Sequence, residues 1–211
     1  MKQTILEATT NPGKVKELAE MLANAAERIQ WVSLGDFPDV TEVVEDGATF
    51  ARNACKKALG YAEQTGLWTL ADDSGLVIDA LDGAPGVRSA RFAADETTST
   101  DRKVIDRANY EKVLRLMDAV PDARRTARFV CHVALAQPGN ILLETTGCID
   151  GVIGREPKGE NGFGYDPVFY IPSLGKTAAE LDSQTKNRIS HRGRAIALLK
   201  PRLEKLLIEL R

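Results

Sequence analysis

The sequence has 211 residues, with 28 Lys and Arg against 30 Asp and Glu, which gives a formal net charge of −2. With 43% hydrophobic and 27% charged residues, the composition excludes a disordered, collagen-like or membrane-embedded chain. The near-neutral charge also argues against a globally basic nucleic-acid-binding protein, while leaving room for a small basic pocket. We expect residues 1–211 to form a single domain.

The cysteines and the apolar runs indicate the compartment. Cys55, Cys131 and Cys148 are too few for a disulfide scaffold, and none lies in the spacing typical of a structural zinc site. The N-terminal segment lacks the apolar stretch of a secretion signal, and no apolar run approaches the ~20 residues that span a bilayer. We therefore expect a cytoplasmic protein without membrane association.

The first part of the chain alternates strands with helices. Residues 3–8 and 29–34 are typical of strands. Between them, Asn11 followed by proline predicts the start of a helix, whose apolar spacing continues to Ala26. A second helix with apolar residues on one face is expected to stop at Gly66.

Residues 67–71 are typical of a buried strand that runs into Asp72-Asp73-Ser74-Gly75. We expect the strand to end there, so that two carboxylates lie at the carboxyl edge of a sheet, where open α/β sheets bind ligands. An Asx-type turn is an equally good interpretation. Residues 76–81 read as helix or strand, and residues 83–86 as a loop.

The second half of the chain is predicted as a helix, an antiparallel hairpin, a glycine-rich loop, a strand and a final helix. The helix is expected at 102–118, the two hairpin strands at 126–136 and 141–149, and the glycine-rich loop at 159–164. The strand is expected at 167–171, and the final helix begins at an N-cap at Ser190. The final helix is expected to direct inward Ala195, Leu198, Leu199, Leu203, Leu206 and Leu210. The pattern predicts an α/β fold with a mixed sheet, and a cleft between a βα-rich lobe and a hairpin lobe as the natural site.

The first candidate site is Thr9-Thr10-Asn11-Pro12-Gly13-Lys14, between a strand and a helix. Free N–H groups and the helix dipole attract anions at such a start, and Lys14 would lie within reach of a bound phosphate. A capped helix with a solvated lysine is the alternative, and the spacing of a Walker A loop is absent.

The acidic pair Asp72-Asp73 is a candidate metal site. Mg²⁺ prefers one or two carboxylates together with waters and substrate phosphates. Glu45, just before the second helix, is a candidate second ligand, although alone it reads as an ordinary charge of a helix start.

Two further motifs suit a nucleotide. In Gly162-Phe163-Gly164-Tyr165-Asp166-Pro167, the glycines allow close approach and Phe163 offers a flat face to a base, unless the aromatic rings simply belong to the core. In the second motif, four cations lie close together at a predicted helix start, where the helix dipole disfavours positive charge. They could bind phosphate or purine carbonyl oxygens, and a solvated basic patch is the alternative. These cations are Lys186, Arg188, Arg192 and Arg194. His132, on a predicted strand, is interpreted as structural or surface-exposed.

In this order, the motifs resemble the inosine triphosphate pyrophosphatase family. The resemblance extends over residues 9–192 and rests on six blocks: Thr9-x-Asn11-x-x-Lys14; Glu45-x-x-x-Thr49-Phe50-x-x-Asn53-Ala54; Ala71-Asp72-Asp73-Ser74-Gly75-Leu76; Pro85-Gly86-Val87-x-Ser89-Ala90-Arg91; Gly162-Phe163-Gly164-Tyr165-Asp166-Pro167; and Lys186-x-x-x-Ser190-His191-Arg192.

The resemblance implies an elongated two-lobed α/β fold with a central mixed sheet flanked by helices, an active-site cleft between the lobes, and a homodimer. It implies a house-cleaning hydrolase that converts dITP, ITP and XTP to the monophosphate and pyrophosphate. Glu45 and Asp73 would hold Mg²⁺, and Asp73 would also be the general base. The triphosphate would be bound by Thr9, Thr10, Asn11, Pro12, Gly13 and Lys14. The rest of the substrate would be bound by Ser74, Phe163, Gly164, Tyr165, Asp166, Lys186, His191 and Arg192.

Chemistry adds an account of selectivity. A cation at Lys186, His191 or Arg192 would donate a hydrogen bond to the 6-oxo group of hypoxanthine or xanthine and leave the 6-amino group of adenine without an acceptor. The alternatives are an Mg²⁺-dependent phosphohydrolase that releases orthophosphate, a pyrophosphatase acting on other modified nucleotides, and a nucleotide-binding module without turnover. The resemblance assigns no role to Asp72.

Overall fold

The computed structural model describes residues 2–22 and 28–209 and divides into two compact units. Unit 1 comprises Met1–Asp73, Cys131–Gly147 and His191–Arg211, and unit 2 comprises Ser74–Val130 and Cys148–Ser190. The strands of the described residues form one sheet in the order β2-β1-β3-β4-β5-β6-β7. β1 pairs in parallel with β2 and β3, whereas β6 pairs antiparallel with β5 and β7. The predicted α/β class with a mixed sheet is thus confirmed.

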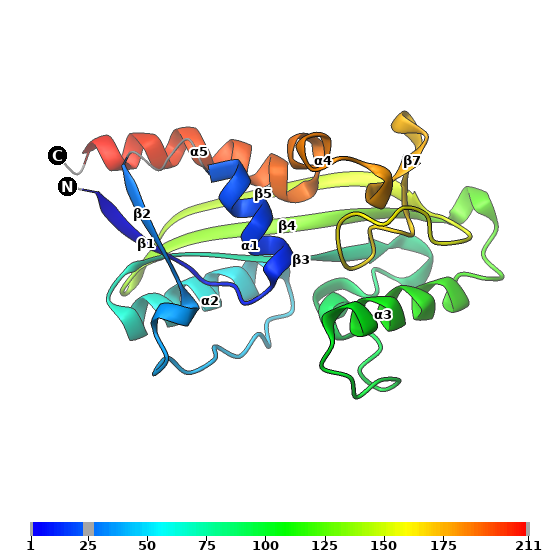
Figure 1. Ribbon diagram of the computed structural model, residues 1–211, viewed down its shortest axis with the longest axis horizontal. Helices are drawn as coiled ribbons and strands as arrows, with labels where there is room; N and C mark the ends of the chain where they lie inside the picture. Colours follow the sequence, from blue (N-terminus) through cyan, green and yellow to red (C-terminus); the bar gives the residue numbers. More distant parts are fainter. Residues whose placement is uncertain (1, 23–27, 210–211) are drawn as a thin grey trace. The chain divides into compact units, whose positions relative to one another are not determined.

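Figure 1 labels most of these helices and strands along the chain. The strands are β1 (Gln3–Glu7), β2 (Ile29–Ser33), β3 (Trp68–Ile78), β4 (Thr126–Gln137), β5 (Asn140–Ile153), β6 (Phe169–Ile171) and β7 (Lys176–Thr177). The helices are α1 (Pro12–Leu22), α2 (Phe50–Thr65), α3 (Arg102–Leu116), α4 (Ser183–Ile189) and α5 (His191–Glu209). Within the described ranges, none of the helices is both long and apolar enough to cross a membrane.

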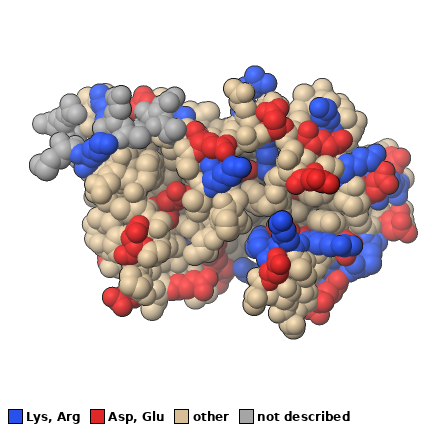
Figure 2. Space-filling view, viewed as in Figure 1, with Lys and Arg blue, Asp and Glu red and all other residues tan. Residues whose placement is uncertain are grey.

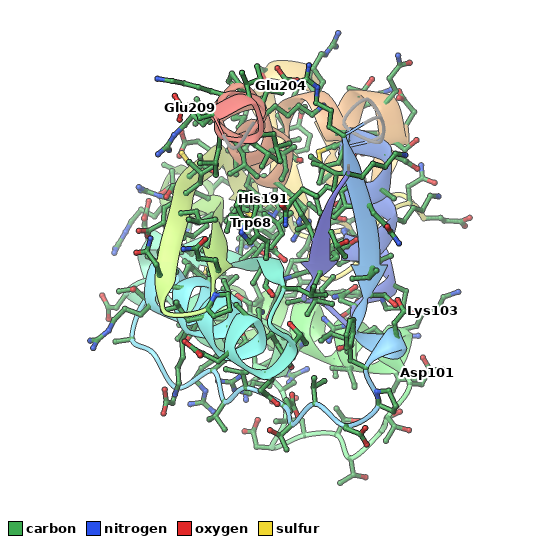
Figure 3. The ribbon with its side chains drawn as sticks, turned by 90° about the vertical axis from the view of Figure 1, so that its left-hand side faces the viewer. Trp68, Asp101, Lys103, His191, Glu204 and Glu209 are labelled. Atoms are coloured by element: carbon green, nitrogen blue, oxygen red, sulfur yellow. The ribbon has the colours of Figure 1, made fainter. Side chains whose placement is uncertain are left out.

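The strands of unit 1 bury side chains on both faces of the sheet. Ile5, Leu70 and Val133 pack in one cluster with residues of α1 and α5. Their strand neighbours point the opposite way because side chains alternate along a strand, and Leu6 and Ala71 pack with α2 instead. Figure 3 shows α2 and α5 on opposite sides of these strands.

The helix ends of unit 1 follow from local chemistry. Asn11 Oδ1 accepts hydrogen bonds from the N–H groups of Gly13 and Lys14 at the start of α1, as predicted. Gly66 ends α2 with φ of 70°, a left-handed conformation that favours glycine. The helical spacing expected as far as Ala26 extends into residues 23–27, which lie outside the described part of the chain.

Unit 2 packs α3 against its own apolar cluster. Val113 and Met117 are fully buried and belong to one cluster with Phe129 and Phe169. The rings of the two phenylalanines are 4.5 Å apart between centroids. The outer side of α3 carries many Lys and Arg residues, which gather over this helix on the face drawn in Figure 2.

Two expectations about element ends and one about a buried side chain were wrong. β3 does not end before Asp72 but continues through Gly75 to Ile78, so the two carboxylates lie inside a strand and neither at its end nor in an Asx-type turn. Ser190 is the C-cap of α4, a helix that the sequence pattern did not predict, and α5 follows directly. Leu198 is 55% exposed, because this position faces away from the cluster that buries Leu199.

The other inward positions of α5 agree with the prediction. Ala195, Leu199 and Leu203 are buried, and Leu206 packs against the same cluster. Leu210 lies outside the described residues. His132, interpreted as structural or surface-exposed, is buried in β4.

Candidate active site

Asp72 and Asp73 are two consecutive buried carboxylates of β3 in unit 1. Side chains alternate along a strand, so Asp72 shares the face of Leu70 and Asp73 shares the face of Ala71. Leu70 packs with residues of α1 and α5, whereas Ala71 packs with residues of α2. Each carboxylate therefore meets a different set of helices.

Asp72 is held by two cations on its face of the sheet. Its Oδ2 lies 3.0 Å from Lys14 Nζ of α1 and 3.0 Å from Arg192 Nη2 of α5. Arg192 is 1% exposed, and its Nη1 lies 2.5 Å from Glu17 Oε2. Burial alone raises the pKa of the Asp72 carboxyl, but Lys14, Arg192 and Lys57 outweigh it and hold the pKa well below its usual range. Asp72 is therefore an ionised anchor for both cations.

Asp73 is fixed from the side of α2. Its Oδ2 accepts a hydrogen bond from Asn53 Nδ2 at 3.0 Å, and Asn53 Oδ1 accepts one from the Gly47 N–H at 2.7 Å. Burial raises the pKa of Asp73 and the nearby Glu45 adds to this, although the bond from Asn53 opposes the shift. The raised pKa makes this carboxylate a stronger base than an ordinary aspartate.

Glu45 and Lys57 complete this side of the site. Lys57 is 8% exposed, and its Nζ lies 3.1 Å from Glu45 Oε2. Burial lowers the pKa of Lys57, but the surrounding carboxylates Asp72, Glu45 and Asp73 outweigh it, so the pKa is raised and the side chain stays charged. Two oxygen-donor carboxylates whose charges interact are a donor set that suits a hard divalent cation such as Mg²⁺.

The segment from Thr9 to Lys14 forms the start of α1. Thr9 Oγ1 accepts a hydrogen bond from the Asn11 N–H at 3.2 Å, and Asn11 Oδ1 accepts one from the Gly13 N–H at 2.9 Å. These bonds shape a turn whose last residue, Lys14, reaches Asp72. The two other members of the segment are exposed: Thr10 and Pro12. A helix start beside a lysine attracts anions.

Unit 2 contains a second group of predicted site residues. Lys186 of α4 is 7% exposed, and its Nζ lies 2.6 Å from Asp166 Oδ2 and 4.8 Å from the centroid of the Phe163 ring. Asp166 Oδ2 also accepts a hydrogen bond from the Phe163 N–H at 2.8 Å. A Cβ at Gly162 would lie only 2.1 Å from this oxygen, so this position requires a glycine. The ammonium is thereby fixed beside a flat ring.

The loop that carries Phe163 is held by buried polar contacts. The Gly164 N–H donates to Asp106 Oδ2 at 2.8 Å, and the Tyr165 hydroxyl donates to the Ser89 carbonyl at 2.7 Å. Burial is the main reason that the pKa of Tyr165 is well above its usual value. Tyr165 therefore acts as a hydrogen-bond donor that fastens the loop.

Two further predicted residues are Ser74 and His191. Ser74 is half-buried in β3, and His191 is buried at the start of α5. A Cβ at Gly147 would lie 2.2 Å from the His191 carbonyl oxygen, so glycine allows β5 to approach the start of α5 closely.

Sequence reasoning assigned no role to Asn53, Lys57 or Glu17 of unit 1, although each contacts a predicted residue. Asn53 and Lys57 lie four residues apart on α2 and so share a face of that helix, which was a usable signal. Glu17, three residues after Lys14, is likewise on the same side of α1. The motif block quoted for the resemblance contained Asn53, but no role was inferred for it.

Comparison with known proteins gives a consistent result. A model described as Ham1 family matches residues 5–202. A dITP/XTP pyrophosphatase of Desulforamulus reducens is 55% identical over 189 residues, which is 90% of each chain. The structure of a HAM1 protein from Coxiella burnetii aligns with a TM-score of 0.84 and 43% identity, covering 96% of this chain and 99% of that chain. A Mycobacterium abscessus nucleoside-triphosphatase / dITP/XTP pyrophosphatase aligns with a TM-score of 0.74 and 43% identity, covering 95% and 100%.

Proposed function

The chain belongs to the Ham1 family, and on that premise we propose that it hydrolyses deaminated purine nucleoside triphosphates (dITP, ITP and XTP) to the monophosphate and pyrophosphate. It is a nucleoside triphosphate pyrophosphatase, a hydrolase of nucleotide metabolism. The observation that carries the proposal is the identity of 55% to a dITP/XTP pyrophosphatase over 90% of both chains. Release of orthophosphate, the alternative reaction, is not favoured.

The proposal assigns the phosphate chemistry to unit 1. The start of α1 and Lys14 would bind the triphosphate, whose negative charge competes with Asp72 for the lysine ammonium. Asp72 and Arg192 would act as positioning residues, because their ion pair holds the lysine and the two helices in place. The same phosphate site would be lined by the other residues of this segment: Thr9, Thr10, Asn11, Pro12 and Gly13.

Asp73 is proposed as the general base. Its buried carboxylate, oriented by Asn53, would take a proton from the attacking water while the new oxygen–phosphorus bond forms. The bond between the α- and β-phosphates then breaks, and pyrophosphate leaves with the electron pair. Lys14 would stabilise the charge that develops on this leaving group.

Glu45 and Asp73 would hold a divalent cation, which we propose to be Mg²⁺. Bound there, the ion would neutralise phosphate oxygens and lower the pKa of a coordinated water. Lys57 would balance the carboxylates around that position. Removal of divalent cations with EDTA should abolish pyrophosphate release, and added Mg²⁺ should restore it; undiminished release in EDTA would contradict this assignment.

Recognition of the base is proposed for Phe163, Asp166 and Lys186. The ring of Phe163 would stack on the purine, and the ammonium held by Asp166 would donate to the 6-oxo group. An adenine amino group would meet a donor there and lose its hydrogen bond. Guanine carries the same 6-oxo group, so its rejection would have to act on its 2-amino group. The remaining predicted contacts are Ser74, Gly164, Tyr165 and His191.

We also propose that the protein is a cytoplasmic homodimer. Size-exclusion chromatography with light scattering would test whether it is a dimer.

The deciding experiment measures pyrophosphate and orthophosphate release with Mg²⁺ from dITP, XTP, ATP, GTP and dTTP. We expect pyrophosphate from dITP and XTP, and a loss of about 100- to 10,000-fold in Asp73→Asn with an unchanged circular dichroism spectrum. Asp39→Asn, at an exposed position, is the matched control. Near-full activity of Asp73→Asn would refute the base assignment, and orthophosphate as the product would refute the reaction.

Lys186 needs a separate test, because its side chain is buried. Lys186→Met should reduce the preference for dITP over dATP in kcat/KM by roughly tenfold or more, and Lys186→Arg should retain part of it because the cation remains. Lys176→Met, an exposed substitution on β7, is the control. An unchanged preference in Lys186→Met would contradict the proposed recognition.

A further inference from the structure

Three side chains with metal-binding atoms meet in unit 1, outside the site described above. Cys55 lies on α2, His132 on β4 and Glu144 on β5. Glu144 Oε2 lies 3.2 Å from Cys55 Sγ and 3.1 Å from His132 Nε2. All three ligand atoms lie within 4.8 Å of one another. The fold thus brings together residues that are far apart in the sequence.

These distances suit a tetrahedral metal ion. Zinc binds sulfur at about 2.3 Å and nitrogen or oxygen at about 2.0–2.2 Å, which separates neighbouring ligands of a tetrahedron by roughly 3.2–3.8 Å. Of the two contacts to the carboxylate, the one at 3.2 Å lies at the lower limit of this range and the one at 3.1 Å lies just below it.

A second contact orients the histidine. His132 Nδ1 lies 2.8 Å from Thr146 Oγ1. When Nδ1 carries the proton and donates it to this hydroxyl, the lone pair of Nε2 points toward Cys55 and Glu144. Ligating histidines in metalloproteins are typically fixed through their other ring nitrogen in this way.

Burial differs among the three residues in a way that allows a metal to enter. His132 is buried and Cys55 half-buried, whereas the side chain of Glu144 is 47% exposed. The carboxylate can therefore move toward solvent to admit an ion, and a water molecule can occupy a fourth position. The Cys55 thiol currently donates to Glu144 Oε2. Binding of a metal ion would replace this hydrogen bond, release the thiol proton to solvent and leave a thiolate as the ligand.

We propose that Cys55, His132 and Glu144 form a binding site for Zn²⁺ or a similar thiophilic divalent cation. The mixed sulfur, nitrogen and oxygen donors favour such an ion over Mg²⁺, which prefers oxygen ligands. The two metal preferences are thus separated by donor chemistry: oxygen at Glu45 and Asp73, and sulfur and nitrogen here. This proposal does not depend on the proposed reaction.

Position on α2 gives the site a structural consequence. Cys55 lies two residues from both Asn53 and Lys57, which contact Asp73 and Glu45 respectively. A bound ion would join α2 to β4 and β5 and so fix the helix that orients the proposed base. Zinc should raise the melting temperature, because a ligand that binds the folded state stabilises it.

The test uses the full-length protein, stripped of metal, reduced, and saturated with Mg²⁺ so that oxygen-only sites are filled. Co²⁺ is added as a spectroscopic probe, and Zn²⁺ is then titrated against a chromophoric chelator. We expect one thiophilic ion per chain, a thiolate-to-cobalt charge-transfer band, visible bands typical of tetrahedral cobalt, and a rise in melting temperature with Zn²⁺.

Variants separate this cluster from other cysteines. Cys55→Ser should remove the charge-transfer band and weaken Zn²⁺ binding by roughly 100-fold or more, and Thr146→Val should weaken it by about 10- to 100-fold. Cys148→Ser, at an exposed cysteine outside the cluster, should leave both unchanged. Equal Zn²⁺ affinity of Cys55→Ser and wild type, or cobalt binding without the charge-transfer band, would overturn the proposal.

Discussion

Replacing Arg192 with methionine tests the buried ion pairs around Asp72. Arg192 Nη2 lies 3.0 Å from Asp72 Oδ2, and its Nη1 lies 2.5 Å from Glu17 Oε2, with the arginine side chain 1% exposed. Methionine keeps a long, unbranched side chain in the same space but removes the positive charge. The guanidinium would then no longer neutralise the two carboxylates that it bridges.

We expect the free energy of unfolding to fall by about 3–5 kcal/mol, the range observed when one partner of a buried ion pair is removed. At about 2–4 °C per kcal/mol for a chain of this size, the melting temperature falls by about 6–20 °C. Arg192→Lys should lose less, because an ammonium keeps the charge but cannot donate to both carboxylates as the planar guanidinium does. Combining Arg192→Met with Asp72→Asn should lose less than the sum of the single losses.

Urea unfolding followed by circular dichroism at neutral pH measures these changes. Arg188→Met, on the exposed side of α4, is the matched control and should change stability by less than about 0.5 kcal/mol. The pKa of Asp72 is held below its usual range, so the ionised carboxylate contributes to stability at neutral pH. The difference in the free energy of unfolding between Arg192→Met and wild type should therefore become smaller as the pH falls below about 4. A loss of less than about 1 kcal/mol for Arg192→Met would refute the reasoning.

Three other predictions concern stability. Burial and Asp72 raise the pKa of Glu7 from 4.5 to about 7, so the free energy of unfolding of the wild type should fall as the pH rises through this interval. At pH ~8, Glu7→Gln should be more stable than the wild type by on the order of 1–2 kcal/mol after solvent screening. At pH ~4, the two proteins should be equally stable. Equal pH dependence of Glu7→Gln and the exposed control Glu42→Gln would contradict this. Gly75→Ala would bring its Cβ 2.3 Å from Ser89 Oγ and should destabilise by about 1–3 kcal/mol, and an unchanged thermal midpoint would argue against this crowding. Ala58 lies at a fully buried position where α2 packs on the sheet. Ala58→Leu should lower the free energy of unfolding, measured by chemical denaturation, by a similar amount. An unchanged free energy of unfolding would mean that α2 can move outward freely.

Elements with local signals were predicted well. The cap at Asn11, the stop at Gly66 and the strand expected at 126–136, which is β4 in the structure, depend on neighbours in the sequence, so pattern alone predicts them. The course of β3 was not predictable in the same way. Two consecutive aspartates are ordinarily a sign that a buried strand has ended, because an unpaired charge in the interior is unfavourable.

The continuation of β3 depends on partners from distant segments. The strand β2 and the helix α2 lie between Lys14 and Asp72 in the sequence, and Arg192 follows Asp72 by more than half of the chain. The crowding of cations near the start of α5 was recognised as a conflict, but its resolution for Arg192 by two carboxylates required the fold. The Cys55 cluster has the same origin, since its three residues come from α2, β4 and β5.

The alternation of Asp72 and Asp73 has a consequence for how such an enzyme can be modified. One carboxylate belongs to the layer of α1 and α5 and the other to the layer of α2, although a single peptide bond joins them. Laboratory evolution could therefore adjust reactivity through substitutions on α2 while the anchor of the opposite layer stays intact. Insertion of one residue before Asp72 in β3 would move each carboxylate to the opposite face of the strand, so the length of this segment is constrained.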